Sequence, residues 1–197
     1  MISNDREYRG FEMRAEEDGM KVTGYAAVFN APAVLYEDGN YQYKEQVDRR
    51  AFDNALMTDV VMNYNHQGKP VARTKNGTLS LTTDDVGLKI SADLSGTEEG
   101  RRLFEEIRGG YIDKMSFAFT VSEEAYDNDS HTRTITGVKR LYDVAAVDIP
   151  AYDQTSISAR DWFTAEAEAQ AKAEARREQI SRIKSLIGVE ENGNEND

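Results

Sequence analysis

The sequence contains no cysteine among its 197 residues. A disulfide framework, a thiolate zinc site and a cysteine nucleophile are therefore excluded. Histidine is almost as scarce, and the two present, His66 and His131, leave little room for a histidine-built metal site. We find no apolar run long enough to span a bilayer, and the charged first residues lack the apolar stretch of a signal peptide. These absences predict a soluble protein of a reducing cytoplasm.

Positive charge is in deficit as well. The chain has 24 Lys and Arg against 36 Asp and Glu, which gives a net charge of −12. A nucleic-acid-binding protein would normally carry a basic patch, so this balance argues against one. The length suits one ordinary domain with an appendage, and it is sufficient to bury a core without covalent cross-links.

The composition divides the chain into a predicted globular domain over residues 8–160, a helical tail over 161–188 and a disordered acidic end over 189–197. The tail is rich in Ala, Glu and Arg, which favour helix. Its apolar stripe is narrow and consists of Ile180, Ile183, Leu186 and Ile187. We interpret the tail as an arm that packs on a partner or as a linker, and a plain solvated helix fits the pattern equally well.

Short apolar segments punctuated by Gly, Asn and Asp predict strands joined by turns within residues 8–160. The expected strands are Lys21–Phe29, Asp59–Asn63, Thr78–Thr82, Val86–Leu94, Met115–Val121, Arg133–Lys139 and Leu141–Ile149. This pattern predicts the α+β class, built as a β-barrel or a highly curved antiparallel sheet surrounded by a few helices.

Two helices are expected between these strands. Asp48 can cap the first, which would carry Phe52, Ala55 and Leu56. Thr97 can cap the second, which would end at Gly109 and turn Leu103, Phe104 and Ile107 toward the core.

His66 is the first candidate for chemistry. It follows an apolar strand and enters a turn, in Tyr64-Asn65-His66-Gln67-Gly68. The end of a strand can present an imidazole to a cleft. On position alone, a loop histidine with no role is the simpler interpretation.

Ser116 is the second candidate. Alternation places Met115, Phe117 and Phe119 on one face of its strand, and Ser116 with Ala118 on the other. We expect the large side chains to enter the core and Ser116 to face a surface of small groups that a substrate can approach. Serine needs a base to become a nucleophile, and an ordinary strand serine is the alternative.

Asp143 is the third candidate, since alternation places it with Leu141, Ala145 and Val147 on an apolar face. A carboxylate there must find a donor. An imidazole N–H is one such donor, and accepting from it is the third role in a Ser-His-acid relay. Neutralisation by Arg140 or Lys139 is the structural alternative. Asp148 lies on the other face and is interpreted as a solvated or turn-capping residue.

Several short motifs follow one another along residues 22–160. They are GYAAVFN (24–30), EQV (45–47), AF (51–52), VMNYNH (61–66), VGL (86–88), GGYI (109–112), MSFAF (115–119), LYDV (141–144), IPAY (149–152) and TSISAR (155–160). Their order, with 50 residues from His66 to Ser116, resembles the prohead protease family of tailed phages, the capsid-maturation proteases.

The resemblance implies a serine endopeptidase with a fold similar to herpesvirus assemblin, a β-barrel ringed by helices. It assigns His66 as the general base and Ser116 as the nucleophile, and it needs no metal or organic cofactor. Asp143 matches the acid, although the family usually has Glu there. The herpesvirus relatives use a second histidine as the third member, for which His131 is the only candidate.

The resemblance also implies the partners. Such enzymes act inside the procapsid, in the host cytoplasm, on the scaffolding segment of the major capsid protein or on a separate scaffold, and usually on themselves. The herpesvirus relatives dimerise, so self-association is a further expectation. A non-catalytic scaffold or capsid-assembly module is the competing hypothesis. A metal-assisted hydrolase would need more ligands than two distant histidines and scattered turn acids supply.

Overall fold

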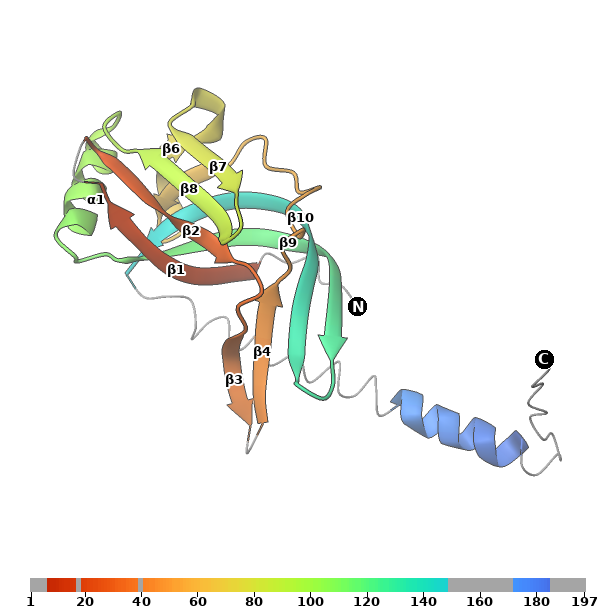
Figure 1. The fold of residues 1–197 in the computed structure, drawn as a ribbon. Helices are drawn as coiled ribbons and strands as arrows, with labels where there is room; N and C mark the ends of the chain where they lie inside the picture. The colour runs from red at the N-terminus through yellow and green to blue at the C-terminus, as the bar shows by residue number, and fades with distance from the viewer. Residues whose placement is uncertain (1–6, 17–18, 39–40, 149–171, 185–197) are drawn as a thin grey trace. The chain divides into compact units, whose positions relative to one another are not determined.

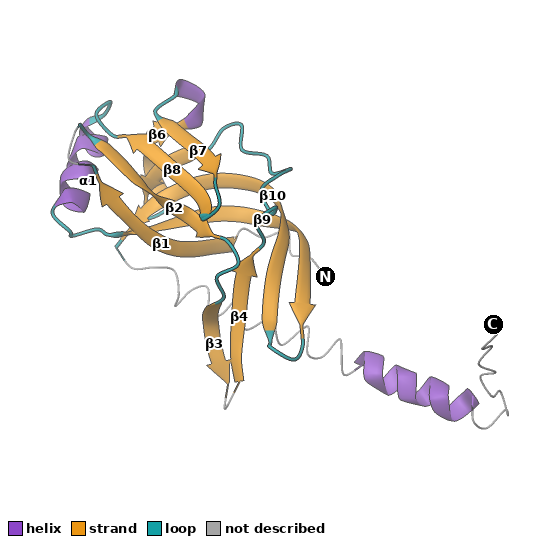
Figure 2. Cartoon of the chain, viewed as in Figure 1, coloured by secondary structure: helices purple, strands orange, loops and turns teal. Residues whose placement is uncertain are grey.

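Strands dominate the first of the two units of the chain (Figures 1 and 2). The computed structural model describes residues 7–16, 19–38, 41–148 and 172–184. The two units, Met1–Ile157 and Ser158–Asp197, are described separately. The elements are β1 (Glu7–Ala15), β2 (Lys21–Val28), β3 (Ala33–Asp38), β4 (Tyr41–Val47), β5 (Val61–Tyr64), β6 (Gln67–Arg73), the 3-10 turn η1 (Thr74–Asn76), β7 (Leu79–Thr83), β8 (Gly87–Asp93), α1 (Glu98–Arg108), β9 (Lys114–Asp127) and β10 (Thr132–Val147).

The long strand β10 organises the sheet. Along one edge it pairs antiparallel with β9. Along the other edge its first residues run parallel to β4 and its last residues run parallel to β5. The strand order is β3-β4-β10-β9-β1-β2-β8-β7, with β5 attached to β10 and β6 attached to β5. This arrangement brings the β5–β6 hairpin beside the end of β10.

The predicted α+β class is confirmed, and the predicted antiparallel sheet is confirmed except at two pairings of β10. The sheet is mixed, because β4 and β5 both run in the direction of β10. Among the described strands no pairing joins the two ends of the sheet into a closed barrel. Alternation in a sequence identifies strands but not their neighbours, so it could not supply the two parallel pairings.

One of the two predicted helices is present, as α1. The Thr97 hydroxyl accepts a hydrogen bond from the Gly100 backbone N–H at 2.9 Å, as expected of an N-cap. Leu103, Phe104 and Ile107 are buried on the inner side of the helix. The helix packs against β1 and β6.

The helix predicted after Asp48 does not form. Residues 49–54 are successive turns with hydrogen bonds over three residues, such as Ala51 N–H to the Asp48 carbonyl at 3.0 Å. The Ala51 carbonyl, which an α-helix would need for residue 55, accepts instead from Val138 of β10 at 2.7 Å. The hydrogen bond to β10 therefore takes precedence over the helical pattern of the residues after Asp48. Asp48 does cap the turn, accepting from the Arg50 N–H at 2.8 Å.

A helix over residues 172–184 is described in the second unit (Figure 1), and every residue of it is exposed, including Ile180 and Ile183. Leu186 and Ile187, the rest of the predicted apolar stripe, lie outside the described residues, as does the predicted acidic end over 189–197. In the described parts of the chain, no helix combines the length and apolarity needed to cross a membrane.

Candidate active site

His66 lies in the two-residue turn that joins β5 to β6. The strands pair up to Tyr64 and Gln67, so Asn65 and His66 are the two central residues. Both have positive φ, 49° and 56°. A two-residue hairpin turn of type I′ requires positive φ at both positions, and Asn adopts it readily. For His66 the left-handed conformation costs about 1–3 kcal/mol, a type of backbone strain that clusters at functional sites.

A set of hydrogen bonds fixes this turn to the end of β10. The Asn65 N–H donates to the Ala146 carbonyl at 2.9 Å, and the Asn65 side-chain oxygen accepts from the Asp148 N–H at 3.4 Å. The Tyr64 hydroxyl donates to the Asp148 carboxylate at 3.1 Å. Burial, and then this bond to Asp148, raise the pKa of Tyr64, so the phenol stays protonated as a donor. Sequence reasoning did not identify these positioning contacts, although an Asn in a strand-ending turn is a recognisable signal.

The His66 and Asp143 side chains are in direct contact. His66 Nδ1 lies 2.5 Å from Asp143 Oδ1, and the two side chains are 17% and 10% exposed. An ionised carboxylate can only accept, so Nδ1 donates and the neutral ring presents its lone pair at Nε2. Among the described residues neither Arg140 nor Lys139 forms an ion pair with Asp143. The Arg140 guanidinium lies over the Tyr142 ring, 5.0 Å from its centroid.

A β-bulge between Leu141 and Asp143 determines which face of β10 carries Asp143. Leu141 pairs with Phe119, yet Asp143 pairs with Ala118, so β10 advances two residues while β9 advances one. A bulge of this kind reverses the alternation. Asp143 and Ala145 therefore share the face of Ser116, whereas Leu141, predicted to lie beside Asp143, is on the opposite face. Without the extra residue, Asp143 would lie among the core phenylalanines.

Ser116 is a diagonal neighbour of Asp143 on this face, since it pairs with Ala145, two residues beyond. Such neighbours are about 7–8 Å apart, a distance that an imidazole can bridge. The Ser116 side chain is fully buried, so the predicted open surface is wrong: β9 is covered on both faces. The Ser116 hydroxyl has no hydrogen bond to any described residue, so a bond to His66 is not formed here. Nucleophile–base bonds are often long in the free enzyme.

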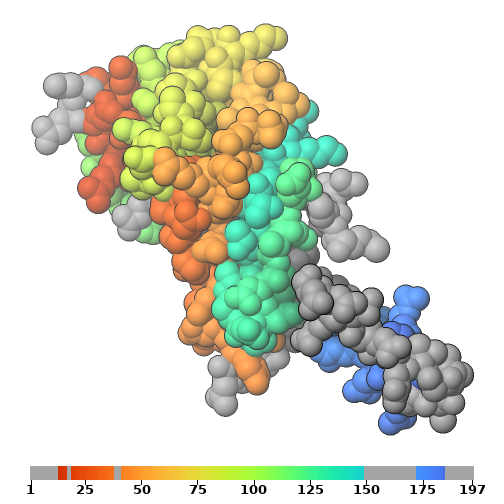
Figure 3. All heavy atoms as spheres, turned by 45° about the vertical axis from the view of Figure 1, so that its right-hand side comes forward, coloured from red at the N-terminus to blue at the C-terminus, as the bar shows by residue number. Residues whose placement is uncertain are grey.

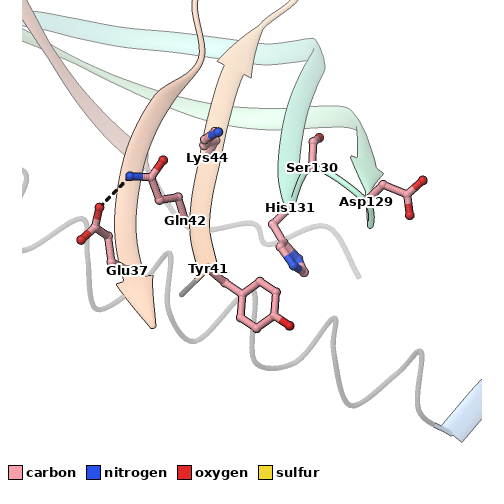
Figure 4. Close-up of a pocket in the computed structure, with 7 residues that line it drawn as sticks. All are labelled: Glu37, Tyr41, Gln42, Lys44, Asp129, Ser130 and His131. Carbon is pink, nitrogen blue, oxygen red and sulfur yellow. Dashed lines mark hydrogen bonds between the residues drawn. The ribbon is translucent and has the colours of Figure 1, made fainter. Parts of the chain in front are cut away.

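His131 lies at the opposite end of β10 from Asp143. The Tyr126 hydroxyl is 3.2 Å from its Nδ1, and the Tyr41 and Tyr43 rings are 4.9 and 5.1 Å from its ring. It lines a pocket of 460 Å³ between the β3–β4 and β9–β10 hairpins, drawn in Figure 4. The structure thus brings His66 and Asp143 together and keeps His131 apart from them.

Carboxylates in the turns bind the backbone. Asp84 accepts from the N–H groups of Val86 and Gly87 at 2.8 and 2.9 Å, which lowers the pKa of Asp84. Within the described residues, no three His, Asp or Glu side chains are grouped so as to hold a metal ion.

The chain was compared with known protein families. The family described as Caudovirus prohead serine protease matches residues 9–172. The chain belongs to this family. The resemblance inferred from the short motifs is therefore confirmed, and the protein is a phage prohead serine protease, a serine peptidase of capsid assembly and maturation.

Among solved structures, the chain is similar to the capsid assembly protease gp21 of bacteriophage T4. The two share 15% sequence identity with a TM-score of 0.46, over 74% of this chain and 98% of that one. A search of curated proteins finds no match.

Proposed function

We propose that this chain is a serine endopeptidase in which Ser116 is the nucleophile, His66 the general base and Asp143 the acid. The proposal is carried by the 2.5 Å contact between His66 Nδ1 and Asp143 Oδ1, on the sheet face that holds Ser116. Membership of a serine protease family supports the choice of a serine nucleophile.

The proposed mechanism is acyl transfer. His66 Nε2 takes the Ser116 proton while the hydroxyl oxygen attacks the peptide carbonyl, and it then protonates the leaving amine. Water, activated by the same imidazole, hydrolyses the acyl-enzyme. Asp143 holds the ring in the tautomer with the proton on Nδ1 and stabilises the imidazolium. The mechanism also needs oxyanion donors for the tetrahedral intermediate, and losing one such donor costs about 3–4 kcal/mol.

The burial of Ser116 adds a requirement. Its side chain has no exposed area, so a substrate must displace whatever covers this face before attack can occur. A covered nucleophile would keep the protease inactive until its substrate is present inside the assembling shell.

The proposed substrate is the scaffolding segment of the major capsid protein, or a separate scaffold, together with this chain itself. Cleavage would occur within the procapsid, in the host cytoplasm. Self-association and the likeness to herpesvirus assemblin are part of the same proposal.

Co-expression with the neighbouring capsid or scaffold protein tests the function, comparing wild type with Ser116→Ala by intact mass. We expect cleavage only when Ser116 is present, and the masses then give the cleavage site. Cleavage that persists in Ser116→Ala would overturn the assignment of the nucleophile. A fluorophosphonate that fails to label Ser116, combined with no cleavage, would favour a non-catalytic assembly module.

We also propose that the tail tethers the protease to the assembling shell. Its residues resemble scaffold helices in composition, and helix 172–184 is exposed on all sides. Deleting the residues after Phe163 should leave peptide cleavage intact and abolish incorporation into procapsids. Normal incorporation of the shortened chain would refute the tether.

A further inference from the structure

Three buried side chains on the face of the proposed relay each carry an oxygen atom that has no hydrogen-bond partner. Within the described residues, Asn63 Oδ1, Ser116 Oγ and Thr120 Oγ1 make no hydrogen bond. Their residues are 7%, 0% and 5% exposed. Buried polar groups are almost always paired, and each exception needs an explanation. The proposed nucleophilic role explains Ser116, but nothing so far explains Asn63.

Strand pairing places Asn63 in the same row as Ser116. On β10, Ala145 pairs with Ser116 of β9 on one side and with Asn63 of β5 on the other. Residues paired across neighbouring strands point to the same face, so the three side chains share one face. Two strand spacings separate Asn63 from Ser116, about 10 Å, with only the Ala145 methyl between them in the sheet.

The chemistry of the carboxamide indicates its partner. An Asn side chain offers both a donor and an acceptor, which is what a peptide group needs for its own C=O and N–H. A peptide carrying its scissile carbonyl on Ser116 would cover about 10 Å with three residues of extended chain. It would then reach Asn63.

We infer that Asn63 is a substrate-binding residue, whose amide hydrogen-bonds a main-chain peptide group about three residues from the scissile bond. This inference rests on the proposed function, because it takes Ser116 as the point of attack. Asn63 stands three residues before His66, so one short strand and its turn would supply both the base and a substrate contact.

A nearly isosteric replacement separates this role from a structural one. Leu has almost the shape of Asn, and exchanging an amide whose buried oxygen has no partner for an apolar group is neutral or stabilising for a fold. If Asn63 serves the substrate, Asn63→Leu should therefore keep or raise the thermal unfolding midpoint while it weakens substrate binding.

The test measures binding and labelling in the full-length chain. The probe is a peptide spanning the cleavage site mapped by co-expression, in a long form with about six residues on each side of the scissile bond and a short form with about two. Binding is measured in the Ser116→Ala background, with and without Asn63→Leu. We expect Asn63→Leu to weaken the long peptide about tenfold, or ~1.4 kcal/mol, and to leave the short one unchanged. A fluorophosphonate should label Ser116 in Asn63→Leu at the wild-type rate.

Thr120→Val is the matched control. It removes another unpartnered buried polar atom from the same face with little change of shape, but Thr120 is four residues from Ser116 along β9, about 13 Å. Its binding of the long peptide should be unchanged.

Several outcomes would overturn the inference alone. In the first, Asn63→Leu binds the long peptide as tightly as the unchanged chain does. In the second, Asn63→Leu loses affinity equally for the long and the short peptide and has a lower unfolding midpoint. In the third, the fluorophosphonate labels Ser116 more slowly in Asn63→Leu. The last would assign Asn63 to positioning the relay. A wild-type chain that neither cleaves nor labels would overturn the proposed function, and this role with it.

Discussion

The two histidines of this chain adopt the same unusual backbone conformation in turns that lie beside opposite ends of strand β10. His66 and His131 both stand in tight turns with positive φ, 56° and 49°. His66 is bound to the carboxylate of Asp143, whereas His131 is bound to a phenol and packed against aromatic rings. A carboxylate partner fixes a tautomer and stabilises an imidazolium, which an uncharged phenol cannot do as strongly. A position in a turn is therefore not enough to make a histidine a general base. The carboxylate hydrogen-bonded to its ring is what suits it to that role.

The surroundings of the two ends differ in the same way. Near His131, β4, β9 and β10 are held together by Arg133, whose guanidinium binds Glu45 at 2.8 Å and Glu124 at 2.5 Å, all well buried. The hairpin end of β9–β10 packs against β3–β4, visible as the green and cyan surface beside orange in Figure 3. Polar groups at that end are paired with one another. At the His66 end, Asn63 and Ser116 have unpaired polar atoms among the described residues.

Exchanging each histidine gives the largest expected contrast. His66→Ala should lower kcat/KM by about 10⁵-fold or more, since loss of the base from a relay is nearly as severe as loss of the whole. His131→Ala should leave kcat/KM close to wild type, because its partners are tyrosines. Cleavage of the mapped peptide measures both. A similar loss in the two variants would make the proposed assignment untenable.

The acid should come next in size. Asp143→Asn keeps the shape but lets the side chain donate, which disfavours the tautomer with the proton on Nδ1, and we expect a loss of about 10⁴-fold in kcat. Asp143→Glu keeps the charge and should retain most of the activity. Equal activity of Asp143→Asn and wild type would remove Asp143 from the relay.

Breaking the ion cluster tests the structural character of the other end. Arg133→Met leaves Glu45 and Glu124 as buried carboxylates without their cation, and we expect a loss of about 3–5 kcal/mol in the free energy of unfolding. Lys44→Met is the control, because it removes the same charge from the residue beside Glu45. Urea unfolding measures both. A variant as stable as the control would show that the cluster contributes no net stability.

The smallest effect concerns the β9–β10 turn beside His131. A hydrogen bond from the Ser130 hydroxyl, and then one from the Asp129 N–H, lower the pKa of Asp127 in the folded state. A depressed carboxyl pKa adds stability above the unfolded-state value of about 3.9 and loses it as pH falls through the folded-state value. Asp127→Asn should therefore be less stable than wild type at pH 7, and the gap in unfolding midpoint should close below about pH 4. A gap that does not change with pH would contradict this assignment.

The sequence by itself supported much of the secondary structure. The Thr97 cap, the two acidic residues after it and the spacing of Leu103, Phe104 and Ile107 suffice for α1, because capping and periodicity are local properties. For the strand Leu79–Thr83 the sequence leaves two partners open, the strand at Asp59–Asn63 and the one across the Asp84-Asp85 turn, and the structure pairs it with the second, Gly87–Asp93. The motif order pointed to the family that the comparison then matched.

Other features depended on tertiary structure. Alternation predicts Asp143 beside Leu141, and only the bulge in the β9–β10 pairing moves Asp143 to the face of Ser116. The helix expected after Asp48 fails because β10 binds the Ala51 carbonyl. The contact between His66 and Asp143 joins residues 77 positions apart and needs the parallel pairing of β5 with β10. Local pattern determines which residues form an element, whereas register and bulges depend on the partner strand, which lies elsewhere in the chain.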